Sequence, residues 1–129
     1  MEKKETSPWK WQDELTYVQA VEVTNVSGTL YVSGQAAVLP DGTSSDAPMR
    51  EQMQIAIANL EEVVTKAGYE LKNIVRLTVY HTNEAEMFAN FELLQNWLKK
   101  HGIKQATTVC QVVALYKTLK FELEATVVK

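Results

Sequence analysis

The sequence predicts an α+β fold in which two helices cover one face of a mixed β-sheet, in the order β-β-α-β-α-β-β. Two segments repeat an apolar residue every three or four positions, which is typical of amphipathic helices. Five other segments are rich in β-branched residues and alternate in character, which is typical of strands. The 129 residues suit a single core, and we expect residues 1–15 to form an N-terminal arm and residues 16–129 one domain.

The N-terminal arm is polar apart from two tryptophans, Trp9 and Trp11, which follow Pro8. This composition predicts an extended arm rather than a regular element. Two exposed indoles are costly on a lone subunit, so we expect them to pack on the body of the protein or on a neighbouring subunit.

The first strands are predicted at residues 17–24 and 29–35. Turn-forming residues 25–28 join them, so the two strands are expected to form a β-hairpin.

A glycine interrupts the second of these strands near its end. Gly34 stands where glycine usually marks a β-bulge or a close approach of another group to the backbone. Ser33 and Gln35 flank it with a hydroxyl and an amide. The strand end is therefore either the floor of a small-molecule pocket or a strand running into the polar loop at residues 36–45, and the strand alone leaves both open.

Two helices follow. The first is predicted over residues 48–67, with Asp46 as its cap, Pro48 in its first turn and Gly68 after its end. Its apolar stripe consists of Met53, Ile57, Leu60, Val64 and Ala67. The second helix is predicted between a capping Asn83 and Gly102, with a stripe of Met87, Phe91, Leu94 and Leu98.

The remaining strands are predicted at residues 73–81, 107–114 and 119–128. Helices on one face leave the other face of the sheet uncovered, and its side chains are semi-polar, including Tyr31, Thr78, Tyr80 and Gln111. We expect subunits to associate through this face, because association is the natural way to bury it.

The charge balance argues against a nucleic-acid partner. The net charge is −3, from 13 basic and 16 acidic residues, and the basic residues are scattered. Nucleic-acid binding depends on phosphate neutralisation by a basic face, which this sequence does not offer.

The sequence also predicts a cytoplasmic protein. No apolar run approaches the length needed to span a bilayer, and the N-terminus lacks the apolar region of a secretory signal. The single cysteine, Cys110, excludes an intramolecular disulfide and fits a reducing compartment.

Few residues suggest chemistry by their spacing. The chain has no phosphate-binding glycine loop and no metal-binding motif, so we expect neither a cofactor nor a metal. Cys110 lies within a strand without an adjoining basic residue and is interpreted as an inert thiol. Glu122 and Glu124 alternate on one strand and so share a face, roughly 6 to 7 Å apart. They are either a general acid or water-orienting group at a pocket or a pair of solvent-facing residues, and spacing alone favours the second interpretation.

Taken together, these segments resemble the YjgF/RidA family of imine deaminases, once labelled endoribonuclease L-PSP. The matching pieces, in order, are Tyr17-Val18-Gln19-Ala20-Val21, Leu30 to Gln35, Asn59-Leu60 with Ala67-Gly68, Ile74 to Val79, and Glu122-Leu123-Glu124-Ala125. Each piece is short, but their order and spacing over almost the whole chain are specific.

The resemblance implies a chorismate-mutase-like fold and a homotrimer whose sheets line a central barrel, with clefts between subunits. In deaminating members, an arginine in a Pro-Ala-Arg-Ser segment clamps the substrate carboxylate, water attacks the imine carbon, and ammonia leaves. By resemblance, Glu122 and Tyr17 are catalytic, and Ser33, Gly34 and Gln35 form one wall of the cleft.

This sequence departs from the family pattern at the clamp. The arginine position falls on Thr107, followed by Thr108, and the family's usual asparagine on the second helix falls on Glu92. Threonine has no charge and less reach than arginine, so it cannot make the clamp. Thr107, Thr108 and Glu92 are nevertheless the positions expected to bind substrate.

Three functions follow from the resemblance. The first is a deaminase-like hydrolase whose substrate differs because Thr107 replaces the arginine. The alternative is a non-catalytic homotrimer that binds a small metabolite in the same clefts. A ribonuclease, as the old family label suggests, is disfavoured by the acidic balance and the absence of a basic face.

Overall fold

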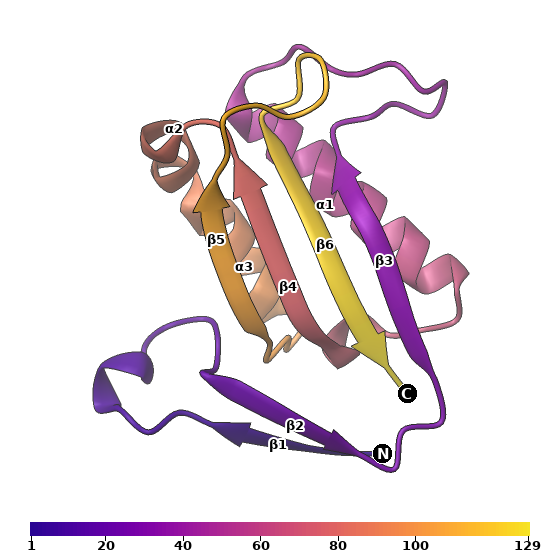
Figure 1. The fold of residues 1–129 in the computed structure, drawn as a ribbon, viewed down its shortest axis with the longest axis vertical. Helices are drawn as coiled ribbons and strands as arrows, with labels where there is room; N and C mark the ends of the chain where they lie inside the picture. The colour runs from indigo at the N-terminus through magenta and orange to yellow at the C-terminus, as the bar shows by residue number, and fades with distance from the viewer.

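The computed structural model describes residues 1–129 and confirms the α+β fold: three helices cover one face of a four-stranded mixed sheet (Figure 1). The strand order is β3-β6-β4-β5, and only β4 and β5 run parallel. The strands span Thr29–Ala36 (β3), Ile74–His81 (β4), Ala106–Gln111 (β5) and Phe121–Val128 (β6). The helices span Met49–Lys66 (α1), Glu84–Ala89 (α2) and Phe91–Lys100 (α3). A short 3-10 turn at Leu71–Asn73 precedes β4.

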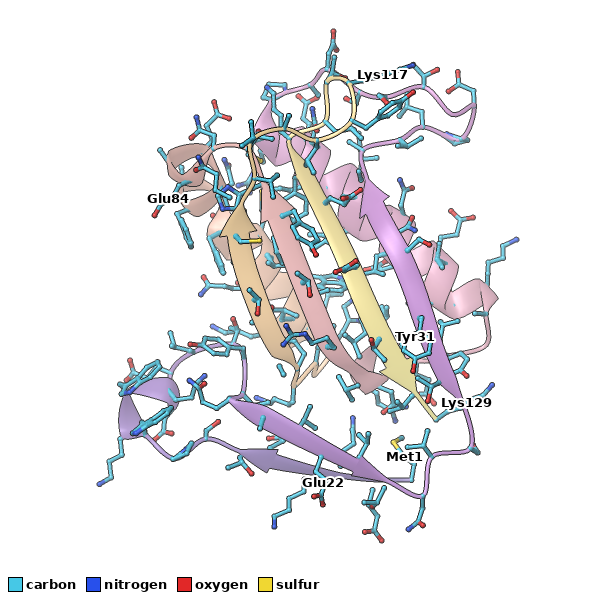
Figure 2. The ribbon with its side chains drawn as sticks, viewed as in Figure 1. Met1, Glu22, Tyr31, Glu84, Lys117 and Lys129 are labelled. Atoms are coloured by element: carbon cyan, nitrogen blue, oxygen red, sulfur yellow. The ribbon has the colours of Figure 1, made fainter.

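The core lies between the helices and the inner face of the sheet. One cluster of 19 buried residues joins the apolar stripe of α1 to alternate residues of β4 and β6. The predicted stripe is confirmed at Met53, Ile57, Leu60 and Val64, whereas Ala67 is exposed at the end of α1. The alternation in β4 and β6 puts the residues between these core positions on the outer face, which the helices do not cover (Figure 2).

The helix ends differ in detail from the prediction. Pro48 is the first flanking residue of α1 and no side chain caps this end, so Asp46 is not the cap. Asn83 does cap α2, because its side chain accepts a hydrogen bond from the backbone N–H of Glu86. The second predicted helix is broken at Asn90 into α2 and α3, since Asn90 leaves the helical conformation there. Gly68 and Gly102 follow their helices with positive φ, as C-terminal glycines do.

The predicted hairpin at residues 17–35 is wrong. The strand β2 (Ala20–Thr24) pairs with β1 (Glu2–Thr6), and these two strands form a sheet of their own. The prediction of an N-terminal arm without a regular element is therefore also wrong, because the arm contains β1 and a 3-10 turn at Lys10–Gln12. In this pairing Lys4 stands opposite Glu22, which brings opposite charges together. Asn25, with a φ of 55°, turns the chain between β2 and β3.

The two sheets lie apart in the structure, with β1 and β2 below the main sheet in Figure 1. Three hydrogen bonds connect residues 1–24 to the body. The Nζ of Lys3 donates to the Lys72 carbonyl at 2.9 Å and to Oδ1 of Asn73 at 3.0 Å, and the N–H of Val18 donates to the Gln105 carbonyl at 3.0 Å. None of the helices is both long and apolar enough to cross a membrane.

Candidate functional site

A β-bulge in β3 brings the backbone of Gly34 against the carboxyl group of Glu122. The register between β3 and β6 shifts between Val32 and Gln35, which places Ser33 and Gly34 in the bulge. A Cβ atom at Gly34 would lie 2.7 Å from Cδ and 2.8 Å from Oε1 of Glu122, closer than real Cβ contacts allow. Both predicted meanings of this glycine are therefore confirmed: it lies in a bulge, and another group approaches its backbone.

The carboxylates of β6 lie on the outer face with Tyr80 of β4. Tyr80 pairs in register with Glu122, and its hydroxyl donates a hydrogen bond to Oε1 of Glu124 at 2.7 Å. This hydrogen bond raises the pKa of the Tyr80 phenol above its usual value, with added contributions from desolvation and from the nearby negative charges. Glu124 is thus held by a neutral phenol, while Glu122 rests on the bulge.

The two polar residues beside Gly34 lie on opposite sides of the sheet. Ser33 is exposed in the bulge, whereas Gln35 pairs with Leu123, whose side chain belongs to the core side. Gln35 lines a hollow together with residues of α1 and of the loop that follows β3. Its Nε2 donates a hydrogen bond to the Ser33 carbonyl at 3.1 Å. The bulge therefore separates residues that the sequence places side by side, because the extra residue reverses the alternation.

The position of the expected clamp is occupied by a threonine whose hydroxyl is already engaged. Thr107 pairs with Leu77 and shares its side of the sheet, and its hydroxyl donates to the Leu77 carbonyl at 2.6 Å. Thr108 points to the outer face, where its hydroxyl accepts a hydrogen bond from Nη2 of Arg76 at 3.1 Å. Thr107 and Thr108 thus serve different faces of β5.

Tyr17 lies at the other end of the sheet from Glu122. Tyr17 precedes β2, and its carbonyl accepts a hydrogen bond from Nε2 of Gln12. The neighbouring Val18 donates its N–H to the carbonyl of Gln105, the residue before β5. The start of β5 is level with Arg76, whereas Glu122 is level with Tyr80, four residues further along β4. Four strand residues span about 13 Å, so one chain does not bring Tyr17 and Glu122 together.

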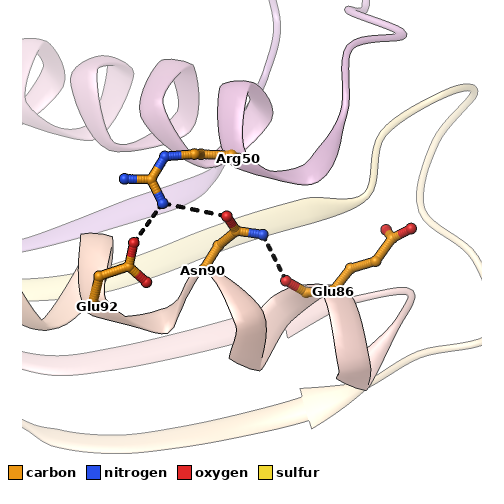
Figure 3. Close-up of polar contacts among 4 residues, drawn as sticks. All are labelled: Arg50, Glu86, Asn90 and Glu92. Atoms are coloured by element: carbon orange, nitrogen blue, oxygen red, sulfur yellow. Dashed lines mark hydrogen bonds and ion pairs between the residues drawn. The ribbon is translucent and has the colours of Figure 1, made fainter.

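Glu92 belongs to the helix layer, away from the outer face of the sheet. It lies in the first turn of α3 and forms an ion pair with Arg50 of α1, with Nη1 of Arg50 at 2.5 Å from Oε1 of Glu92 (Figure 3). Nη1 of Arg50 also donates to Oδ1 of Asn90, whose Nδ2 in turn donates to the Glu86 carbonyl. The hydrogen bond from Arg50 lowers the pKa of the Glu92 carboxyl below its usual value.

The structure adds a hollow on the outer face that was not predicted as a site. It measures about 610 Å³ and its polar lining residues are Tyr31, Arg76, Thr78, Tyr80, Thr108, Glu124 and Thr126. Tyr31 projects into solvent from β3 in Figure 2. The alternation of β4 already placed Arg76 on this face, and an arginine facing outward from an interior strand is the signal that could have identified it.

Comparison with known proteins identifies the family. The sequence model described as Endoribonuclease L-PSP matches residues 11–129. The putative reactive intermediate deaminase TdcF of Escherichia coli strain K12 is 28% identical over 114 residues, covering 88% of this chain and 86% of TdcF. The 2-iminobutanoate/2-iminopropanoate deaminase of Rattus norvegicus is 32% identical over 114 residues, covering 88% of this chain and 80% of its own length.

Solved structures have the same fold. The Rid-family protein of unknown function YyfB from Yersinia pestis has a TM-score of 0.87 at 26% identity, with 100% of both chains covered, so the match includes the N-terminal strands. E. coli TdcF with bound serine has a TM-score of 0.72 at 27% identity, covering 88% of this chain and 87% of TdcF. With the family model spanning all but the first ten residues, the chain belongs to the YjgF/RidA family, the Endoribonuclease L-PSP family of the matching sequence model.

Proposed function

We propose that the protein is a small-molecule hydrolase of the imine or enamine deaminase type, with a substrate other than the 2-imino acids of its arginine-containing relatives. The observation that carries the proposal is the contact of Glu122 with the bulge at Gly34. It supplies a carboxylate beside exposed backbone, on a sheet face that also offers hydroxyl groups. Relatives named as deaminases support the same reaction type.

The chemistry asked of Glu122 is proton transfer to and from water. The carboxylate takes a proton as water adds to the imine carbon, and a carbon–oxygen bond forms. That proton passes to the nitrogen as the carbon–nitrogen double bond becomes a single bond, which gives a carbinolamine. The hydroxyl proton of the carbinolamine is then transferred through the carboxylate to the nitrogen, the carbon–nitrogen bond breaks, and ammonia leaves with a carbonyl product. A positioned carboxylate typically contributes 10²- to 10⁴-fold to such a step.

The altered substrate follows from Thr107. Its hydroxyl donates to the Leu77 carbonyl, and the side chain carries no charge that could hold a carboxylate. A bidentate guanidinium–carboxylate contact is among the strong hydrogen-bonded pairs, so its loss weakens binding of any 2-imino acid held in that way. The proposed substrate is neutral at this position or is anchored elsewhere.

The proposed assembly is a homotrimer with clefts between subunits. Within one chain Tyr17 and Glu122 lie at opposite ends of the sheet, so a cleft that uses both needs Tyr17 from a neighbouring subunit. Ser33, Gly34 and Thr108 are exposed on or beside the outer face and are available to such a cleft. Gln35 and Glu92 lie toward the helix-covered side of the sheet, so they contribute to such a cleft only if the neighbouring subunit contacts that side. The proposed compartment is the cytoplasm, in keeping with the free thiol of Cys110.

A second candidate is a trimer that binds a metabolite without turnover, and the engaged hydroxyl of Thr107 favours it. It shares the cleft and differs in outcome, because a ligand that is bound and not consumed raises the thermal midpoint and persists in solution. A ligand panel followed by product analysis separates the two candidates.

The proposed activity is tested by ammonia release from freshly generated 2-iminopropanoate and from a panel of neutral imines and enamines. We expect slow release from 2-iminopropanoate and faster release from at least one neutral substrate, with that activity reduced at least about 100-fold in Glu122→Gln. Glu22→Gln, an exposed glutamate in β2, is the matched control and should retain full activity. Thr107→Arg should increase hydrolysis of 2-iminopropanoate. Equal activity of Glu122→Gln and the unmodified protein would refute the proposal.

A further inference from the structure

Two side-chain amides of α1 reach the end of the sheet where Gly34 meets Glu122. Gln52 and Asn59 are about two helical turns apart, and both lie on the side of α1 that is turned toward the sheet. Gln52 is completely buried and Asn59 is partly buried. Neither amide bonds within α1, and both bond to backbone groups at or just beyond the ends of β3 and β6.

Gln52 joins the loop that follows β3 to the loop that precedes β6. Its Nε2 donates toward three carbonyl groups, those of Ser45 at 3.3 Å, Ala47 at 3.0 Å and Thr118 at 3.1 Å. Its Oε1 accepts the backbone N–H of Lys120 at 2.8 Å. The hydroxyl of Thr118 also donates to the Ser45 carbonyl at 2.6 Å, so the two loops are in direct contact at this end of the sheet (Figure 1). One buried amide thus fixes where the chain enters β6.

Asn59 fixes where β3 ends. Its Nδ2 donates to the carbonyl groups of Ala36 and Val38, at 2.9 Å each. Ala36 is the last residue of β3 and stands opposite Glu122 in the register of the sheet. Asn59 therefore holds the residue that pairs with the proposed catalytic carboxylate.

The two amides hold β3 and β6 close to the contact between Gly34 and Glu122. Ala36 lies two residues beyond Gly34, and Lys120 lies two residues before Glu122. The contact itself is close, since a Cβ atom at residue 34 would lie 2.7 Å from Cδ of Glu122. A displacement of about 1 Å at a reacting group can cost 10²-fold in rate, so the position of these strand ends matters for catalysis by the carboxylate.

We propose that Gln52 and Asn59 are positioning residues for Glu122, and that their amides set how closely the carboxylate lies against the bulge. Gln52 is buried and Asn59 lines the hollow on the helix side, so both act through the backbone of β3 and β6 rather than on a substrate at the outer face. Without these amides, the carbonyl groups and the N–H of Lys120 lose their partners, and the two loops lose the bonds that hold them. The proposal rests on the catalytic role proposed above for Glu122.

The test is a double-mutant cycle between Gln52 and Glu122. Turnover is measured as ammonia release from freshly generated 2-iminopropanoate, or from the neutral imine of the panel that is hydrolysed fastest. Gln52→Met keeps the length of the side chain and removes its hydrogen bonds, so it should lower kcat about ten-fold and change KM less than about two-fold. In a Glu122→Gln background the same substitution should lower the residual kcat less than about two-fold, because no carboxylate is left to misplace. Gln54→Met, at an exposed position of α1, is the matched control and should leave kcat unchanged.

Asn59→Asp is a second variant at a site that is only partly buried. It keeps the shape of the side chain and replaces the donor Nδ2 by an oxygen, which repels the carbonyl groups of Ala36 and Val38. We expect it to lower kcat in the same way as Gln52→Met. Asn96→Asp, at an exposed position of α3, adds the same charge without these contacts and should leave kcat unchanged.

A second measurement reports the position of the carboxylate without turnover. The ¹³C resonance of the Glu122 carboxyl is assigned by its loss in Glu122→Gln. That resonance and the amide resonance of Gly34 should shift in Gln52→Met and in Asn59→Asp, and should stay in place in the two controls. If the unmodified protein hydrolyses no substrate of the panel, the proposed function fails, and these resonances still decide whether the amides hold the carboxylate.

Three outcomes would overturn the proposal. The first is an equal fold reduction of kcat by Gln52→Met in both backgrounds, which would show that the amide acts on the fold as a whole and not through Glu122. The second is unchanged kcat or unchanged resonances in the folded variants, which would leave the proposed hydrolase standing. The third is failure of both Gln52→Met and Asn59→Asp to fold, which would assign the amides to folding alone.

Discussion

The carboxyl group of Glu122 occupies the space that a side chain at residue 34 would need, since a Cβ atom there would lie 2.7 Å from its Cδ. Glycine at this bulge thus allows the carboxylate to lie directly against the backbone. The two residues form one unit of the candidate site, and each constrains what the other position accepts.

The contact of Gly34 with Glu122 predicts non-additive substitutions. Gly34→Ala should destabilise the protein by about 1 to 3 kcal/mol and lower activity, because the added methyl group displaces the carboxylate. In a Glu122→Ala background the same substitution should cost much less, as the colliding atoms are absent. Urea denaturation of the four proteins of this cycle measures the coupling. An equal cost in both backgrounds would show that the bulge itself, and not the carboxylate, excludes alanine.

The hydroxyl of Thr107 predicts a small structural cost for its removal. Thr107→Val removes the hydrogen bond to the Leu77 carbonyl while preserving the shape of the side chain, so we expect a loss of about 0.5 to 1.5 kcal/mol. Thr108→Val, on the opposite face, is the comparison, because its hydroxyl is exposed and accepts only from Arg76. Chemical denaturation measures both variants. A larger loss in Thr108→Val than in Thr107→Val would contradict this assignment of faces.

The ion pair of Glu92 with Arg50 predicts a contribution to stability that depends on pH. The hydrogen bond from Arg50 lowers the pKa of Glu92 in the folded state, so the contribution is present above the unfolded value near 4.5 and is lost as pH falls through the lower, folded value. The thermal midpoints of the unmodified protein and Glu92→Gln should therefore converge in acid. Added salt should reduce the difference, since both side chains are about half exposed. Glu62→Gln serves as the control, and a gap that stays constant with pH would rule the contribution out.

The contacts of Lys3 predict a local effect on the N-terminal sheet. Lys3→Met removes the hydrogen bonds to the Lys72 carbonyl and to Asn73, which hold β1 against the body. A two-stranded sheet is marginally stable alone, so amide hydrogen exchange in β1 and β2 should accelerate while exchange in the main sheet stays unchanged. Lys4→Met, whose residue faces Glu22 across the strand pair, is the matched control. Uniform acceleration throughout the chain would show that the contact stabilises the whole fold.

The helices and the faces of the strands could be predicted because local periodicity fixes them. Met53, Ile57 and Leu60 recur at helical spacing and are buried, while Leu77 and Val79 alternate with outward-facing residues in β4. The pairing of strands could not be predicted in this way. Segment 29–35 pairs with β6 from the other end of the chain, and β2 pairs with β1, because hydrogen bonding between strands depends on partners that local sequence does not specify.

The candidate site shows the same division. Sequence placed Glu122 and Glu124 on one face and indicated a bulge or a close backbone approach at Gly34, since alternation and the special backbone freedom of glycine are local properties. Their contact across β3 and β6, the opposite faces of Thr107 and Thr108, and the hollow beside Arg76 arise from register between strands.

The sequence by itself determined the family and the fold class, because these depend on residue types and their order along the chain. Only the tertiary structure decided that Glu122 rests on Gly34, that Tyr17 lies at the far end of the sheet, and that Arg76 and Glu124 line one hollow. The physical reason is that a bulge and a strand register set which side chains meet, and both are fixed by hydrogen bonds between segments far apart in the sequence.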